Sequence, residues 1–370
     1  MSTLRTTSRR MTNKRIKAWV RPEIQALAAY HVPPAEGYIK LDAMENPYGW
    51  PDDLTQEWSA GLRDVALNRY PDPEASDLKV RLREYFELPS DQVMLLGNGS
   101  DELIQLIAMA VAEPGRAVLA AEPGFVMYRA IAQALGLRYV GVLLRASNFA
   151  LDANAMLRAI EEYQPALVFL ACPNNPTGNL FKRQDIDAIA AASPGLVVID
   201  EAYHAFCGES FIDLLAQHDH VVIMRTLSKL GLAALRIGLL IGNEAWLEEL
   251  NKIRLPYNLN TLSQFTAGFI LQHKAVLNEQ AARIRRDREQ LFQSLQQFQG
   301  VQVWPSRANF LLFRVPGATK VYARLKTENI LIKSLTAGHP LLADCLRVTV
   351  GTEPENAAFL DALGLALTEA

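Results

Sequence analysis

Lys229 lies in a run, residues 225–238, that follows an apolar segment, residues 221–224, which predicts a buried strand. In α/β folds, chemistry gathers at the carboxyl ends of such strands. Burial or a neighbouring cation lowers the pKa of a lysine and makes its amine a nucleophile. Arg236, seven positions further on, could supply that positive charge while it binds an anionic group. Because a lone Ser-Lys pair is more often an ordinary surface turn, the prediction of a reactive lysine depends on three other segments.

The first of these segments is a second apolar run, residues 197–199, which ends in Asp200 and is followed by Tyr203. A buried carboxylate needs a partner, and a protonated heterocyclic nitrogen would be one. The hydroxyl of Tyr203 could donate a hydrogen bond to a phenolate-like oxygen. An aspartate that caps a helix after a strand gives the same local pattern, so this segment alone leaves both interpretations open.

The second segment is a predicted strand, residues 166–171, followed by a turn that contains Asn175. Two prolines and a glycine fix this turn. Pro176 favours an extended backbone at Asn175, and the amide can then point inward. A purely structural turn would also explain the pattern.

The third segment is a glycine-rich turn, residues 96–99, that leads through Ser100, Asp101 and Glu102 into a helical pattern. Glycines permit a close approach of the backbone, and the free N–H groups at a helix start bind phosphate. Ser100 adds a hydroxyl group. An ordinary capped helix is the alternative interpretation.

Together and in this order, the four segments indicate a site for pyridoxal 5′-phosphate. They offer a phosphate cup, an amide for the ring oxygen, a carboxylate for the pyridine nitrogen and a lysine for the aldehyde. The pattern resembles the fold-type I aminotransferases, the aspartate aminotransferase superfamily, from about residue 41 to residue 365. Six stretches resemble the histidinol-phosphate aminotransferases more specifically: residues 42–49, 69–73, 97–102, 256–260, 308–312 and 346–352.

This resemblance implies catalytic roles for Lys229, Asp200 and Tyr203. Lys229 would form the Schiff base with the cofactor and carry the proton, and Asp200 would pair with the pyridine nitrogen. Tyr203 and Asn175 would bind the ring oxygen, and Tyr128 would stack on the ring.

The resemblance also implies which residues hold the phosphate and the substrate. The phosphate would contact Ser100, the backbone N–H groups of Asp101 and Glu102, Ser228, Arg236, and Tyr70 of the neighbouring subunit. The substrate would contact Arg347, Asn175 and, as a secondary contact to its phosphate, Lys333.

The reaction implied by the resemblance interconverts L-histidinol phosphate and 2-oxoglutarate with imidazole acetol phosphate and L-glutamate, a step of histidine biosynthesis. The implied fold is a large domain with a mostly parallel sheet and a smaller α+β domain, in a homodimer with shared active sites. A threonine-phosphate decarboxylase or an aromatic-amino-acid aminotransferase would share the cofactor residues, so both alternatives stay open.

Two positions depart from the family pattern. Arg236 follows Lys229 by seven positions instead of eight, which makes the intervening loop one residue shorter. Lys333 stands where many members carry an arginine, and a lysine offers a point charge instead of a planar fork.

Motifs, net charge and cysteine spacing argue against several other classes of protein. A nicotinamide-binding turn would need a third glycine at the position of Glu102, and a transcription regulator would need a DNA-binding domain for which the N-terminus is too short. The net charge of −3 argues against nucleic-acid binding, and no apolar run reaches the length of a membrane span. The three cysteines show neither disulfide nor zinc spacing, which indicates a reducing compartment, the cytoplasm, and no metal.

The pattern along the chain predicts four parts. Residues 1–20 are basic without an acidic side chain, and we expect a mobile arm there in preference to a targeting peptide. Residues 21–65 would join the small domain and the dimer interface, residues 66–285 would form the large cofactor-binding domain, and residues 286–370 the small domain. Six strands are expected, near residues 117–121, 139–143, 167–171, 196–200, 221–225 and 238–241.

Overall fold

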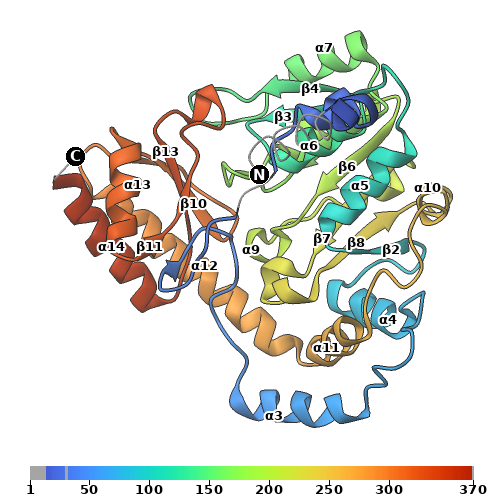
Figure 1. Cartoon of the computed structure of the whole chain (residues 1–370), viewed down its shortest axis with the longest axis horizontal. Coiled ribbons are helices and arrows are strands. Elements are labelled where there is room, and N and C mark those ends of the chain that lie inside the picture. The colour runs from blue at the N-terminus through green and yellow to red at the C-terminus, as the bar shows by residue number, and fades with distance from the viewer. Residues whose placement is uncertain (1–13, 30–31, 369–370) are drawn as a thin grey trace, which may run out of the picture.

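A seven-stranded sheet forms the centre of the larger part of the protein (Figure 1). The structure is a computed structural model that describes residues 14–29 and 32–368. The strand order is β2-β8-β7-β6-β5-β3-β4, in which β8 is antiparallel to both of its neighbours and the other pairs are parallel. The strands are β2 (Val93–Asn98), β3 (Ala117–Glu122), β4 (Arg138–Leu143), β5 (Leu167–Ala171), β6 (Leu196–Asp200), β7 (Val221–Thr226) and β8 (Ile237–Gly242).

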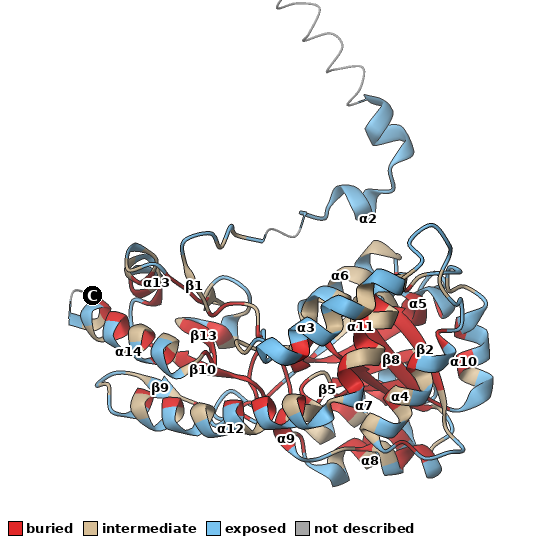
Figure 2. Cartoon of the chain, turned by 90° about the horizontal axis from the view of Figure 1, so that it is seen from below, coloured by how far each residue is buried: buried red, intermediate tan, exposed pale blue. Residues whose placement is uncertain are grey.

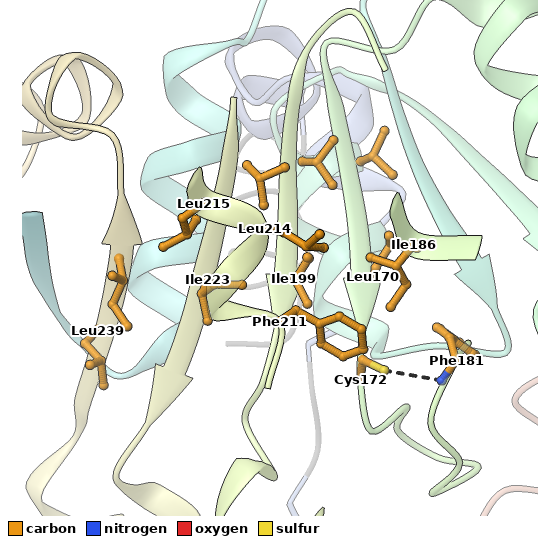
Figure 3. Close-up of a cluster of buried hydrophobic side chains, with 14 of the residues drawn as sticks. Leu170, Cys172, Phe181, Ile186, Ile199, Phe211, Leu214, Leu215, Ile223 and Leu239 are labelled. Atoms are coloured by element: carbon orange, nitrogen blue, oxygen red, sulfur yellow. Dashed lines mark hydrogen bonds between the residues drawn. The ribbon is translucent and has the colours of Figure 1, made fainter. Parts of the chain in front are cut away.

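Helices cover both faces of this sheet, which explains why its central strands are apolar throughout. Alternate residues of a strand point to opposite faces. Leu170 of β5 and Ile199 of β6 belong to the core on one face, whereas Phe169 and Val198 belong to the core on the other. Figure 3 shows the first of these cores, in which Leu170, Ile199 and Ile223 lie side by side on adjacent strands.

The helices of this part lie before, between and after the strands of the sheet in the chain. They are α3 (Asp52–Gly61), α4 (Ser76–Phe86), α5 (Ser100–Ala110), α6 (Val126–Ala134), α7 (Ala153–Tyr163), α8 (Arg183–Ala192), α9 (His204–Cys207), α10 (Glu244–Asn251) and α11 (Thr261–Gln272). Among the described residues, no helix combines the length and the apolar composition that a membrane span requires.

A smaller part with a four-stranded antiparallel sheet follows the long helix α12 (Lys274–Gln296). Its strand order is β12-β13-β10-β9. The strands are β9 (Gln302–Val303), β10 (Phe310–Arg314), β12 (Lys333–Ser334) and β13 (Cys345–Thr349), and the helices are α13 (Ala318–Thr327) and α14 (Glu353–Thr368). The predicted domain division at residue 285 falls inside α12, so the chain passes between the two parts along one continuous helix.

The N-terminal segment crosses from one part to the other. Its strand β1 (Ile39–Lys40) pairs with β11 (Ile330–Leu331) beside the small sheet, and α3 lies against the large part (Figure 2). Residues 14–19 are helical and exposed, and α2 (Pro22–Gln25) follows. Most of the predicted arm, residues 1–13, lies outside the described residues.

The six predicted strands are present, and each end lies within one residue of the prediction. A seventh strand, β2, was not predicted; it lies at the edge of the sheet and pairs with the antiparallel β8. Its end, Gly97 and Asn98, carries turn residues that mask the strand pattern. The antiparallel strand β8, which pairs with both β2 and β7, makes the sheet mixed, although most of its pairs are parallel.

Candidate active site

The ends of the parallel strands bring most of the predicted site residues into one cavity of about 100 Å³. Ala171 ends β5, Asp200 ends β6 and Thr226 ends β7, and parallel strands end at the same edge of a sheet. The other residues that line the cavity are Met44, Ser100, Asp101, Phe125, Pro173, Asn175, Ala202, Tyr203, Ser228, Lys229 and Arg236.

Lys229 lies in a short 3-10 turn directly after β7, with its amine inside the cavity. The Nζ atom donates a hydrogen bond of 3.2 Å to the carbonyl oxygen of Ala43. Burial, together with the charges of Arg347 and Arg236, lowers the pKa of Lys229 to about 8 against the opposing charges of Glu45 and Asp101. The site therefore produces a lysine that loses its proton close to neutral pH, as a nucleophile or general base requires.

This lowered pKa predicts how Lys229 reacts in the cofactor-free protein. Above the pKa the amine is neutral and nucleophilic, so trace acetylation of Lys229 should rise with pH and reach its midpoint near pH 8 instead of 10.5. Peptide mapping across a pH series measures this midpoint. In an Arg347→Gln variant the midpoint should move to higher pH, because a charge that disfavours the protonated amine is removed. A midpoint near 10.5 in the unaltered protein would contradict the prediction.

Asp200 is buried and lines the cavity. Its Oδ2 atom accepts a hydrogen bond of 2.5 Å from the hydroxyl of Tyr128, and its Oδ1 atom accepts one of 3.0 Å from the backbone N–H of Ala202. Burial raises the pKa of Asp200 to about 6, although these hydrogen bonds act in the opposite direction. A carboxylate whose ionised form is disfavoured by burial gains from a cationic partner, and the cavity leaves space for one.

The position of Tyr128 does not fit the predicted stacking role. Its side chain is buried outside the lining of the cavity, stacks on Phe169 with 4.3 Å between the ring centroids, and directs its hydroxyl to Asp200. Tyr128 belongs to α6, whose inner face packs on the sheet. Phe125, in the loop before that helix, lines the cavity and is the aromatic residue placed to cover a ring. The sequence signal for it was the first aromatic side chain after Pro123.

The phosphate cup predicted at the start of α5 is formed by Ser100, Asp101 and Arg236. The guanidinium of Arg236 lies 3.3 Å from Oγ of Ser228 and 3.4 Å from Oδ2 of Asp101. Gly99 adopts a φ of 83°, and a Cβ atom there would collide with this guanidinium. Three kinds of anion-binding group thus meet: free N–H groups of a helix start, hydroxyls and a guanidinium.

The shorter loop between Lys229 and Arg236 still lets Arg236 reach the cup. Arg236 adopts a left-handed backbone conformation with a φ of 53°, directly before β8. Gly238 lies so close to Gly99 that a Cβ atom would collide with the backbone there. Because β8 passes directly beside the cup, the guanidinium reaches it even with the shorter loop.

The side chain of Glu102 does not line the cavity. Its Oε2 atom accepts hydrogen bonds from the backbone N–H of Asn98, at 2.5 Å, and from Nδ2 of Asn258, at 2.7 Å. The carboxylate therefore anchors the turn before α5. Only the backbone N–H predicted for Glu102 remains available for an anion.

Asn175 and Arg347 meet at the boundary between the two parts. The Nη1 atom of Arg347 donates a hydrogen bond of 2.5 Å to Oδ1 of Asn175, and Nη2 donates one of 3.0 Å to the carbonyl oxygen of Asp42. Tyr203 lies edge-on to Phe310, and burial raises its pKa, so its hydroxyl remains a donor. The guanidinium of Arg347 lies over the same Phe310 ring.

A second cavity of about 730 Å³ adjoins the first, since Met44, Phe125 and Asn175 line both. Lys333 of β12 and Arg347 of β13 are paired neighbours in the small sheet and line this larger cavity together. Its volume falls within the range of ligand pockets. The two predicted substrate-binding cations therefore lie beside the Lys229 cavity and not inside it.

Tyr70 lies apart from both cavities. It is 80% exposed and stacks on Tyr257, with 4.5 Å between the ring centroids. The predicted contact of Tyr70 with a neighbouring subunit is therefore not tested by the single chain.

The residues present fit pyridoxal 5′-phosphate. Asp200 offers a buried carboxylate in need of a cation, Lys229 offers an amine that is easily deprotonated, and Gly99 leaves the space that an anion at the cup requires. Phe125 supplies an apolar cover between them.

Known proteins share this sequence and this fold. Residues 36–363 match the family model of aminotransferase class I and II. The chain is 57% identical over 355 residues to histidinol-phosphate aminotransferase 2 of Nitrosococcus oceani. The aligned residues cover 95% of this chain and 98% of that protein. It is 51% identical over 348 residues to histidinol-phosphate aminotransferase of Chromobacterium violaceum, with coverages of 94% and 98%. The crystal structure of histidinol-phosphate aminotransferase from Sinorhizobium meliloti in complex with pyridoxal 5′-phosphate matches with a TM-score of 0.85 and 25% identity, and covers 95% of this chain and 98% of that one. The chain therefore belongs to the class I and II aminotransferases and, among them, to the histidinol-phosphate aminotransferase family.

Proposed function

We propose that this protein is a pyridoxal 5′-phosphate-dependent histidinol-phosphate aminotransferase of histidine biosynthesis. It transfers the amino group of L-histidinol phosphate to 2-oxoglutarate and so forms imidazole acetol phosphate and L-glutamate. The two substrates react in turn at the same site. The observation that carries the proposal is that the amine of Lys229, the carboxylate of Asp200 and the guanidinium of Arg347 surround adjoining cavities in a member of this family.

Pyridoxal 5′-phosphate, when bound, supplies an electron sink for the electron pair that remains when the substrate loses its Cα proton. Asp200 would stabilise a positive charge on the ring nitrogen because its carboxylate is buried and needs a cation. Tyr203 and Asn175 would bind the ring oxygen, and Phe125 would cover the ring. Ser100, Ser228 and Arg236, with the N–H groups at the start of α5, would hold the phosphate.

Lys229 moves the proton at the Cα atom of the substrate. Its pKa of about 8 brings its basicity close to the working pH, which is where a general base is most effective. Arg347 binds the anionic group of each substrate and at the same time keeps the lysine easy to deprotonate. One guanidinium thus serves both binding and proton transfer.

A direct assay tests this function. Purified protein loaded with pyridoxal 5′-phosphate should convert L-histidinol phosphate and 2-oxoglutarate to glutamate, and should release no carbon dioxide from L-threonine phosphate. The second substrate is the informative control, because a decarboxylase with the same cofactor residues would act on it. Carbon dioxide release without histidinol-phosphate turnover would move the protein to that other class.

We also propose that the protein forms a homodimer in which the two subunits share their active sites, and that it is located in the cytoplasm. Tyr70 and Tyr257 form an exposed aromatic pair, and a side chain of this kind is typical of an interface. Residues 21–65 would take part in that interface, with residues 66–285 and 286–370 as the two domains. The three free, buried cysteines are compatible with a reducing compartment.

Mixed dimers should reveal shared sites. When Tyr70→Phe subunits are combined with Lys229→Ala subunits, the hybrid contains one site with both defects and one with neither. We expect the purified hybrid to regain about half of the activity of the unaltered dimer, measured per dimer, because one site is complete. A hybrid no more active than its two parents would argue against a contribution of Tyr70 to the neighbouring site.

A further inference from the structure

Glu122 is a carboxylate that lines the larger cavity and has no role in the reaction described above. It ends β3 and is the only carboxylate among the described residues that line this cavity. Its side chain is 13% exposed. The Oε1 atom accepts hydrogen bonds from Nε of Arg129, at 3.1 Å, and from Nη2, at 2.5 Å. The Oε2 atom lies 3.9 Å from Nε2 of His339, which is beyond hydrogen-bond distance.

The surroundings fix this carboxylate in place. Gly141 of β4 lies beside it, and any Cβ atom there would collide with the carboxylate. Burial lowers the pKa of Arg129, but the hydrogen bond to Glu122, the charge of Glu122 and the effect of Tyr139 together raise it more, so the guanidinium stays charged. Burial raises the pKa of Tyr139, and the charge of Glu122 and a hydrogen bond to it raise that pKa further. Arg129 thus holds Glu122 through Oε1, whereas Oε2 lies on the side of His339, which lines the same cavity.

His339 does not neutralise the second oxygen at neutral pH. Burial lowers the pKa of this histidine, and the charge of Arg129 lowers it as well, against the opposing charge of Glu122. The ring of His339 is therefore uncharged under working conditions. A carboxylate in this position favours a ligand that brings a hydrogen-bond donor or a positive charge.

The three groups on the reacting carbon of L-histidinol phosphate diverge, and the cavity walls offer a place for each. The amino group must face Lys229, and the phosphate is attracted to the wall formed by Arg347 and Lys333. The imidazole arm remains, with its N–H group. The wall left for it carries Phe125, which can cover an aromatic ring, and Glu122, which can accept its hydrogen bond.

We propose that Glu122 is the specificity-determining residue that recognises the imidazole ring of the amino substrate through an N–H···Oε2 hydrogen bond. The proposal rests on the proposed function, because it assumes histidinol phosphate as the substrate. A substrate of the same shape without a ring N–H would leave the carboxylate without its donor, and such a loss gives strong discrimination. Glutamate brings no ring and gains nothing from Glu122.

The test measures single-turnover kcat/KM of the cofactor-loaded enzyme for three amino donors: L-histidinol phosphate, L-phenylalaninol phosphate and L-glutamate. The first two share the amine and the phosphate arm and differ in the ring. We expect the unaltered enzyme to prefer histidinol phosphate by on the order of 10- to 100-fold, the usual worth of a hydrogen bond to a charged group. Glu122→Gln should reduce this preference about tenfold or more and leave the glutamate value unchanged.

A matched control is Glu113→Gln, which removes a carboxylate from an exposed pair with Arg116 ahead of β3. It should leave all three values unchanged. Equal losses for all three donors in Glu122→Gln would show that Glu122 only supports the structure around Arg129, and the proposal would be wrong. If Glu122→Gln does not fold, the unaltered enzyme decides alone, since equal rates with the two phosphorylated donors would overturn the proposal. An unaltered enzyme that uses glutamate but neither phosphorylated donor would instead contradict the proposed function.

Discussion

Replacing Lys229 by alanine is expected to lower kcat by about 10²- to 10⁴-fold, the range that general acid–base catalysis contributes. The side chain is buried, its amine lies in the cavity with Asp200, and burial together with Arg347 lowers its pKa to about 8. No other lysine lines that cavity in the described part of the chain, so nothing nearby can take over the proton. Stopped-flow absorbance of each half-reaction should show the loss with glutamate and with histidinol phosphate alike.

Lys229→Arg separates proton transfer from charge. Arginine keeps the positive charge but does not give up its proton at working pH, so we expect this variant to be as inactive as Lys229→Ala. Lys252→Ala is the matched control, since Lys252 is exposed and pairs only with Glu249 of its own helix among the described contacts. Turnover of Lys229→Arg within tenfold of the unaltered enzyme would show that the charge, not the proton, is what the reaction needs.

The sequence predicted the site best where a polar residue ends an apolar strand. Asp200 and the segment before Lys229 stood out because the central strands are buried on both faces, and a polar residue after such a run has few structural reasons to be there. The same argument located Asn175 after β5. Strand ends of a parallel sheet meet at one edge, so the order of these residues along the chain was enough to bring them together.

The sequence failed where the orientation of a helix or the approach of a second segment decides the role of a side chain. Tyr128 and Phe125 are three residues apart, and only the packing of α6 on the sheet shows which of them lines the cavity. The role of Glu102 depends on Asn258, more than 150 positions away in the chain. Glu122 gave no signal at all, because its neighbours Arg129, Gly141 and His339 gather around it only in the folded protein.

Arg347 is expected to matter for both substrates. Arg347→Gln should lower kcat/KM by about 100-fold or more for glutamate and for histidinol phosphate, because two charge-assisted hydrogen bonds to the anionic group are lost. A second effect acts in the same direction. Arg347 lowers the pKa of Lys229, so its removal leaves a larger share of that lysine protonated and unable to accept a proton at neutral pH.

A comparison with Lys333 shows which cation serves which substrate. Lys333 lies next to Arg347 across the β12–β13 pair and lines the larger cavity. Lys333→Ala should impair the histidinol-phosphate half-reaction more than the glutamate half-reaction, because a phosphate dianion gains more from a second cation than a carboxylate does. The exposed Arg116, changed to Gln, should affect neither half. Small and equal losses in both halves for Arg347→Gln would show that the anions bind elsewhere. A guanidinium that binds both substrates must, when it is removed, impair both half-reactions. A large loss confined to the phosphorylated substrate would therefore mean that Arg347 binds only the phosphate and that another group binds the carboxylates of glutamate.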